Sequence, residues 1–151
     1  MHISMKLLDI FFAITLSVTT AVLPVSAAET MAGLLNVHIH GAIENSGSIE
    51  VKLLSNQQQY DEQSPPYREC SQPADTQGAQ CVFSDLPYGD YAIFAYHDKN
   101  SDRDLNVNYF GIPIERLAIS NVNLETNEDP TFDDSKFSFN SQHAQVFLNL
   151  Q

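Results

Sequence analysis

The sequence predicts an all-β fold in which two antiparallel sheets pack as a sandwich. Apolar residues recur at every second position in several segments, which is the period of a strand with one buried face. Gly, Pro and Asn-Ser clusters separate these segments at short intervals, as turns do in sandwiches. After the first 28 residues, no window sustains helical spacing for three turns. We therefore expect packed strands and no helix of consequence.

The strands expected from this alternation can be placed along the chain in order. They cover residues 35–39, 49–53, 81–83, 91–96, 137–139 and 146–150. The segment 91–96 is almost continuously apolar, which is typical of a central strand buried on both faces. Residues 55–80 form a long polar stretch broken by Pro65, Pro66 and Pro73, and we expect no strand there.

The first 28 residues have the features of a secretory signal peptide. Lys6 precedes an apolar run from Ile10 to Val25, and the small residues Ser26-Ala27-Ala28 follow it. The alternative is an uncleaved anchor, but several Ser and Thr residues make this run marginal for crossing ~30 Å of hydrocarbon. We expect a secreted or periplasmic protein with one domain over residues 29–151 and no membrane insertion after cleavage.

The charge balance excludes one large class of partners. The chain has 7 Lys plus Arg against 19 Asp plus Glu, and the formal net charge is −12. Nucleic acid is excluded as an expected partner, because phosphate binding needs clustered cations. The same acidity disfavours an anionic bilayer and favours cations or basic surfaces.

Two cysteines, Cys70 and Cys81, are present in the whole chain. In an exported protein they are expected to form a disulfide. The bridge would tie a polar loop to the strand that begins at Cys81. A redox or metal-binding pair of cysteines is the alternative, but such a pair would require cysteines closer together in the sequence or additional ligands.

An acidic segment after the central strand has the spacing of a calcium loop. EF-hand loops place ligands at positions 1, 3, 5, 7 and 9, position 7 through its carbonyl, with Gly at 6 and Glu at 12. Counting Asp98 as position 1 places Arg103 at position 6 and Tyr109 at position 12, so two positions depart from this pattern. Glu115 or Asn108 could complete the ligand set. The candidate calcium ligands are Asp98, Asn100, Asp102, Asp104, Asn106 and Glu115.

An ordinary acidic turn, with Asp and Asn side chains bonded to nearby amides, is the alternative to an ion site. The segment Phe110-Gly111-Ile112-Pro113 follows the loop. It is either a lid that packs over the loop and aims Glu115 at the ion, or a plain surface loop pinned by Phe110 and Ile112.

The sequence resembles two kinds of known protein. The phrase from Leu86 to Tyr91, L-P-x-G-x-Y, resembles one in transthyretin-like and collagen-adhesin B-repeat sandwiches. This resemblance implies a prealbumin- or immunoglobulin-like Greek-key topology of about seven strands. The phrases F-G-I-P-x-E and S-N, with the strand from Leu35 to Gly41, resemble an exported bacterial family, domain-of-unknown-function family 2141 (DUF2141). That family usually has Gly at Arg103 and Asp at Asn106, and it implies a fold and export rather than an activity.

Histidines and carboxylates leave two other functions open. His38 and His40 lie two apart on one strand face and could ligate zinc or copper, if His97 or His143 lay beside them. The acidic cluster could supply a carboxylate pair for glycan hydrolysis, but Trp and the nucleophile and phosphate motifs are missing from the sequence. We expect no enzyme. The main expectation is an exported binding module with a weak structural calcium site and a protein or glycan partner.

Overall fold

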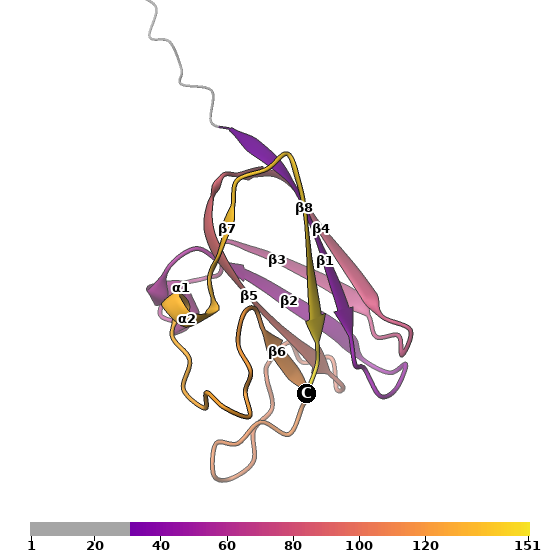
Figure 1. Cartoon of the computed structure of the whole chain (residues 1–151). Coiled ribbons are helices and arrows are strands. Elements are labelled where there is room, and N and C mark those ends of the chain that lie inside the picture. Colours follow the sequence, from indigo (N-terminus) through magenta and orange to yellow (C-terminus); the bar gives the residue numbers. More distant parts are fainter. Residues whose placement is uncertain (1–30) are drawn as a thin grey trace, which may run out of the picture.

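The computed structural model describes residues 31–151, and these residues form two β-sheets packed face to face (Figure 1). The all-β prediction is confirmed. The expected signal peptide, residues 1–28, lies outside the described residues. Within the described part, no helix is long and apolar enough to cross a membrane.

The first sheet has three strands in the order β4-β1-β8. They are β1 (Ala32–His40), β4 (Ala79–Pro87) and β8 (His143–Asn149). β1 pairs antiparallel with β4 but parallel with β8, so the prediction of purely antiparallel pairing is wrong at this one contact. A parallel pair needs a long crossover, and the chain supplies one by building the second sheet between β1 and β8.

The second sheet has five strands, with β3-β2-β5-β6 in one row and β7 paired to β5. All of these pairings are antiparallel. Its strands are β2 (Ser48–Leu54), β3 (Arg68–Pro73), β5 (Gly89–Asp98), β6 (Leu117–Ile119) and β7 (Phe137–Phe139). The strands described thus number eight rather than about seven, and the Greek-key topology stays a prediction.

Strands β3 and β6 were not expected from the sequence. β3 is an edge strand that pairs only with β2 and alternates between half-buried and exposed positions. An edge strand needs fewer apolar residues, so the polar composition of this stretch gave no indication of a strand. β6 has three residues, which is too short for a period to show.

Two single-turn helices also depart from the prediction of no helix. They are α1 (Gln57–Tyr60), capped by Asn56, and α2 (Phe132–Ser135), which has a capping box between Thr131 and Asp134. A helix of one turn shows no amphipathic period, so only its cap could have predicted it.

The core between the sheets is built from the alternating residues that the sequence identified. Leu35, Val37 and Ile39 of β1, together with buried residues of its neighbour β4, pack against buried residues of β2 and β5 in the other sheet. A second small cluster, Leu54, Ala92 and Phe132, lies on the opposite face of the second sheet under α1 and α2. β5 is therefore covered on both faces, which explains its continuous apolar run.

The expected disulfide joins Cys70 of β3 to Cys81 of β4, with Cα atoms 6.0 Å apart. β3 and β4 belong to different sheets. The bridge therefore fastens the two layers together at this edge of the sandwich, rather than only closing a loop.

Candidate functional site

The acidic segment lies in the loop between β5 and β6, at the lower end of the molecule in Figure 1. Asp98 is the last residue of β5, and it is fully buried. Its carboxylate accepts hydrogen bonds from the backbone amides of Arg103, at 2.7 Å, and Asp102, at 3.3 Å. The loop therefore curls around the Asp98 side chain.

The curl depends on a left-handed backbone at Ser101 and Arg103, with φ of 59° and 67°. Arg103 occupies the position where an EF-hand loop has Gly, and the chain adopts the glycine-like conformation there despite its side chain. The Tyr96 hydroxyl donates to the Arg103 carbonyl at 2.6 Å, which holds this turn against the sheet. Tyr96 did not stand out in the sequence, because its position in β5 predicts only burial.

Three of the alternating side chains converge within the loop. The Asn100 amide nitrogen lies 2.7 Å from Asp102 Oδ2 and 3.0 Å from Asn106 Oδ1. The Asn106 amide nitrogen lies 3.2 Å from the same Asp102 oxygen. The pKa of Asp102 is lowered, chiefly by the Asp104 backbone amide and then by the Asn106 and Asn100 side chains.

Glu115 comes from the far side of the loop and closes it. One carboxylate oxygen accepts from the Lys99 amide and the other from the Asn106 amide, both at 2.9 Å. Glu115 is 6% exposed. One buried carboxylate thus bridges the beginning and the end of the acidic segment. Asn108, the other residue considered for this role, instead accepts hydrogen bonds from Phe110 and Ile112.

The carboxylates themselves are not gathered into one cluster. Asp104 is exposed, and its side chain makes no hydrogen bond or ion pair with other residues of the described part. Among residues 31–151, no group of three or more His, Cys, Asp or Glu side chains is arranged to hold a metal ion. The oxygen-bearing set is therefore two buried carboxylates plus the triad Asn100, Asp102 and Asn106.

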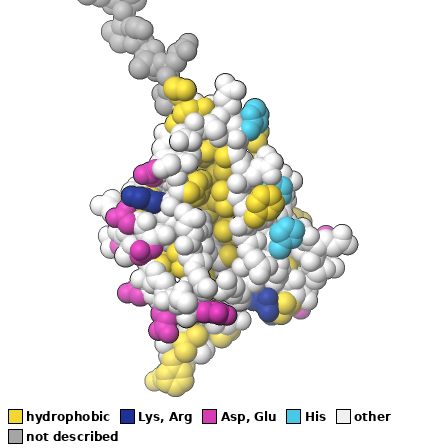
Figure 2. Space-filling model, in the orientation of Figure 1, with side chains coloured by type: hydrophobic (Ala, Val, Ile, Leu, Met, Phe, Trp, Pro, Cys, Tyr) yellow, Lys and Arg dark blue, Asp and Glu magenta, His cyan; other side chains and the backbone are white. Residues whose placement is uncertain are grey.

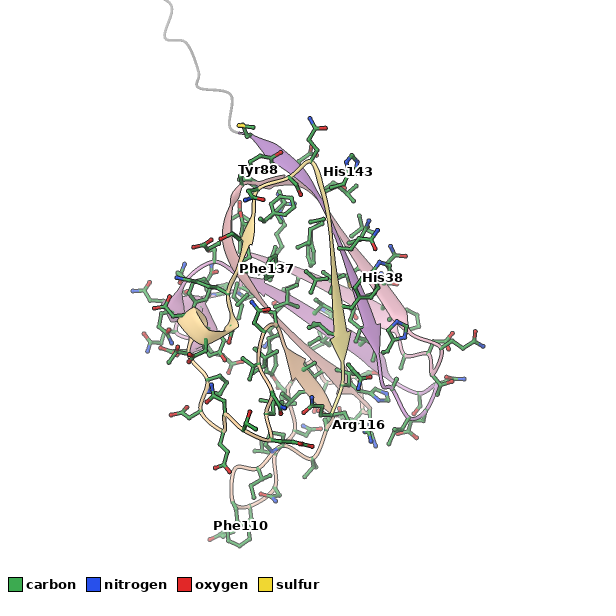
Figure 3. The ribbon with its side chains drawn as sticks, viewed as in Figure 1. His38, Tyr88, Phe110, Arg116, Phe137 and His143 are labelled. Atoms are coloured by element: carbon green, nitrogen blue, oxygen red, sulfur yellow. A yellow bond between two sulfur atoms is a disulfide. The ribbon has the colours of Figure 1, made fainter. Side chains whose placement is uncertain are left out.

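The segment expected to be a lid does not cover the loop. Residues 107–113 form a small hairpin, with a bridge between Val107 and Pro113. At its tip Tyr109 is 97% exposed and Phe110 82% exposed, and Figure 3 shows Phe110 pointing away from the body of the protein. Both expectations, a packed lid and a loop pinned by Phe110, are wrong, because the Asn108 turn projects the tip outward.

The histidines do not come together. His38 and His40 share the outer face of β1, as predicted, but the His38 ring stacks on Phe147 with centroids 4.7 Å apart. His143 lies at the opposite end of β8, and His97 is buried in the other sheet with Nε2 2.8 Å from the Ser46 carbonyl. Figure 2 shows histidines over the side of the molecule that carries β8. Zinc or copper binding stays a prediction, to be tested with His38→Ala and His40→Ala.

The Ser-Asn phrase has a structural role that the sequence did not reveal. The Ser120 hydroxyl accepts from the buried Ile93 amide at 2.8 Å and donates to the Ser135 carbonyl at 2.7 Å. Asn121 has a left-handed backbone, with φ of 58°, and its side chain donates to the Lys136 carbonyl. These bonds attach α2 to the second sheet.

The family of the chain follows from a comparison with family models. The model described as "Uncharacterized protein conserved in bacteria (DUF2141)" matches residues 37–146. The chain belongs to this family. The matched region runs from β1 to β8, so it includes the acidic loop, Glu115 and the exposed hairpin.

The DUF2141 match thus covers most of the sandwich, and the resemblance that the sequence suggested is confirmed. No curated protein and no solved structure matches the chain. The similarity to transthyretin-like sandwiches stays a prediction.

Proposed function

We propose that this protein is an exported binding module whose acidic loop holds a structural calcium ion. The supporting observation is that Asp98 and Glu115 are both buried, while neither forms an ion pair within residues 31–151. Buried carboxylates are normally paired with a cation or coordinate one, since burial of an isolated charge is costly. A divalent cation would balance the two.

The three lysines of the described part are engaged elsewhere. The ion pairs of the described part are Lys52–Glu62, Lys99–Glu44 and Lys136–Asp133. Lys99 directly follows Asp98, yet its ammonium group lies 3.3 Å from Glu44. With a net charge of −12, the protein attracts cations from solution, and a metal ion would be a suitable counter-ion.

The loop offers oxygens of the kind calcium prefers. Carboxylates, side-chain amides and backbone carbonyls are the usual ligands of this ion. The amide nitrogens of Asn100 and Asn106 now point to Asp102. Rotation of each amide by a half-turn would present its oxygen instead, with no change of the backbone.

The ion would have a structural role and not a catalytic one. Glu115 bonds to both ends of the acidic segment, and the hairpin with Tyr109 and Phe110 lies between Asn106 and Glu115. Ordering the loop would fix the orientation of the hairpin. Exposed aromatic side chains at such a tip suit contact with a protein or glycan partner.

Terbium luminescence tests this proposal directly. Terbium substitutes for calcium and emits when a nearby tyrosine transfers energy to it, and the protein lacks Trp. Tyr96 touches the loop at the Arg103 carbonyl. We expect emission that calcium competes away, and a calcium-dependent rise in Tm that EDTA reverses. A free calcium concentration of 100 times Kd should add about 2.7 kcal/mol to the free energy of unfolding.

The variant for this test is Asp98→Asn with Glu115→Gln, and Asp102→Asn serves as a milder second variant because Asp102 is exposed. The control, Asp85→Asn with Asp90→Asn, removes the same charge at exposed sites in β4 and at the start of β5, the end of that strand opposite to Asp98. Emission should be lost in the first variant, weakened in the second and kept in the control. The absence of terbium emission and of a calcium effect on the unvaried protein would reject the ion site.

A further inference from the structure

A cavity of about 670 Å³ lies on the outer face of the five-stranded sheet, away from the core between the sheets. Its floor consists of Leu54 of β2, Phe94 of β5 and Ile119 of β6. Sites for small molecules are commonly about 300–1,000 Å³ and mostly apolar. The cavity therefore has the size and floor of a ligand site.

The walls come from three parts of the chain that are distant in sequence. Tyr60 and the end of α1 form one side, Leu105 and Val107 form another, and Pro130 closes a third. Tyr60 and Phe94 add aromatic rings to the apolar lining. Aromatic faces attract cations through their quadrupole as well as apolar groups through contact.

The rim of this cavity is strongly acidic. It carries Asp61, Glu62, Asp104 and Asp129 against a single cation, Lys52. The Lys52 ammonium lies 3.2 Å from Glu62 and 5.7 Å from the centre of the Tyr96 ring, so its charge is already engaged. Three carboxylates remain without an ion pair among residues 31–151.

Acidic side chains also gather around this side of the molecule. Figure 2 shows Asp and Glu side chains over the side that carries α1 and α2 and over the lower end of the protein. Because these charges surround an apolar floor, an anionic ligand would meet repulsion and a neutral one would desolvate carboxylates without compensation.

We infer that this cavity binds an organic cation, which is an alkyl or aromatic body that carries a positively charged nitrogen. The body packs on Leu54, Phe94 and Ile119, and the nitrogen lies at the rim near Asp61, Asp104 and Asp129. A free amine and a Lys or Arg side chain of a peptide share this chemistry. The site goes beyond the proposed function, since its floor and two of its three free carboxylates lie outside the acidic loop and require no calcium.

The first experiment uses three probes with the same six-carbon chain, namely hexylammonium, hexanol and hexanoate. Each is titrated into the ¹⁵N-labelled protein in EDTA, and amide shifts are followed by NMR. We expect hexylammonium to bind about tenfold more tightly than hexanol, with hexanoate the weakest, because the rim charge favours one sign. The shifts should centre on Phe94, Ile119 and Tyr60. The preference should shrink as salt is added.

Two variants with matched net charge separate the effect of the rim carboxylates from the effect of the overall charge of the protein. Asp61→Asn with Asp129→Asn changes two rim carboxylates outside the ion loop. We expect it to weaken hexylammonium binding by about tenfold and to leave hexanol unchanged. The control Asp85→Asn with Asp90→Asn changes exposed residues that do not line the cavity. It has the same net charge and should bind as the unvaried protein does. Equal binding of the three probes, no binding, or shifts outside the cavity would overturn the inference.

A further arm distinguishes the two sources of the cation. The peptide acetyl-Gly-Lys-Gly-amide is titrated beside its norleucine analogue, which has no ammonium group. Binding of the lysine peptide with shifts at Phe94 and Ile119 would identify a basic side chain as the ligand. Binding of hexylammonium alone would identify a free amine, and the failure of both would again reject the site. Terbium emission, measured separately, reports on the acidic loop, so the two proposals can fail independently.

Discussion

The Asp98 carboxylate accepts a 2.7 Å hydrogen bond from the backbone amide of Arg103, a residue with a left-handed φ of 67°. The bond and the backbone conformation depend on each other. The amide reaches the buried carboxylate only because the chain turns sharply at Arg103. The hydrogen bond that this turn provides to the Asp98 carboxylate offsets the cost of the left-handed backbone. This pair sets the shape of the whole acidic loop.

Replacement of Arg103 by Gly should stabilise the protein. Gly adopts a positive φ without the steric cost of a Cβ atom, and relief of that cost is worth about 1 kcal/mol. The matched variant is Arg103→Ala, which removes the same side chain but keeps the Cβ. Urea unfolding should rank Arg103→Gly above Arg103→Ala in free energy of unfolding. Equal stability of the two variants would show that the left-handed turn carries no strain.

Loss of the Glu115 carboxylate should open the loop. Glu115→Ala leaves the Lys99 and Asn106 amides without their acceptor, and a hydrogen bond to a charged group contributes about 1.5 to 3 kcal/mol. We expect a lower midpoint of urea unfolding and faster hydrogen exchange at those two amides. Glu69→Ala, at an exposed site, is the control and should change neither. Unchanged exchange at Lys99 and Asn106 in Glu115→Ala would contradict the assigned bonds.

Removal of the Cys70–Cys81 disulfide should cost about 2 to 3 kcal/mol by the loop-closure estimate. The test is Cys70→Ala with Cys81→Ala, unfolded in urea beside the oxidised protein. Treatment of the oxidised protein with a reducing agent should give a similar loss. Because the bridge joins β3 to β4, the exchange of amides in β3 should rise more than that in β5. A uniform rise in amide exchange across both sheets would show that the disulfide does not stabilise β3 locally.

Stability should fall at alkaline pH because of three tyrosines. Burial, followed by nearby carboxylates of which Glu50 is the largest contributor, raises the pKa of Tyr96 above its ordinary value. Burial also raises the pKa values of Tyr60 and Tyr91. The folded state keeps these protons where the unfolded chain releases them, so the stabilisation is complete below about pH 10 and is lost above it.

Urea unfolding between about pH 8 and pH 11 measures this effect. Tyr96→Phe should be less stable at neutral pH, because it loses the bond to Arg103, but should show a shallower decline above about pH 10. Tyr109→Phe is the control, since Tyr109 is exposed, and its profile should follow that of the unvaried protein. Parallel alkaline slopes for all three proteins would show that Tyr96 does not contribute.

Much of the fold could be predicted because its signal is local. Leu35, Val37 and Ile39 repeat with the period of a strand, and the structure buries all three. The cysteine pair was predictable because export, which we expect from residues 1–28, favours a disulfide. β3 and β6 were not predicted, because an edge strand and a three-residue strand form by pairing with their neighbours and lack a clear sequence pattern of their own.

The candidate site divides in the same way. The spacing of Asp98, Asn100, Asp102 and Asn106 marked the loop, and Glu115 was considered for it because it follows the loop in the next segment of the chain. The direction of Phe110 could not be predicted, since it depends on how the Asn108 turn leaves the sheet. The cavity was equally hidden, because Leu54, Phe94 and Ile119 become neighbours only when three strands pair.

The sequence by itself determined the all-β class, the core-facing residues, the disulfide partners and the position of the acidic loop. These properties follow from side-chain alternation and from short-range spacing, which the chain carries before it folds. The tertiary structure alone decided the parallel β1–β8 pair, the outward hairpin and the acidic-rimmed cavity. The strand pair and the cavity join residues far apart along the chain, and such contacts form only when packing and hydrogen bonding select one arrangement. The hairpin is local, but its direction depends on how its turn leaves the rest of the protein.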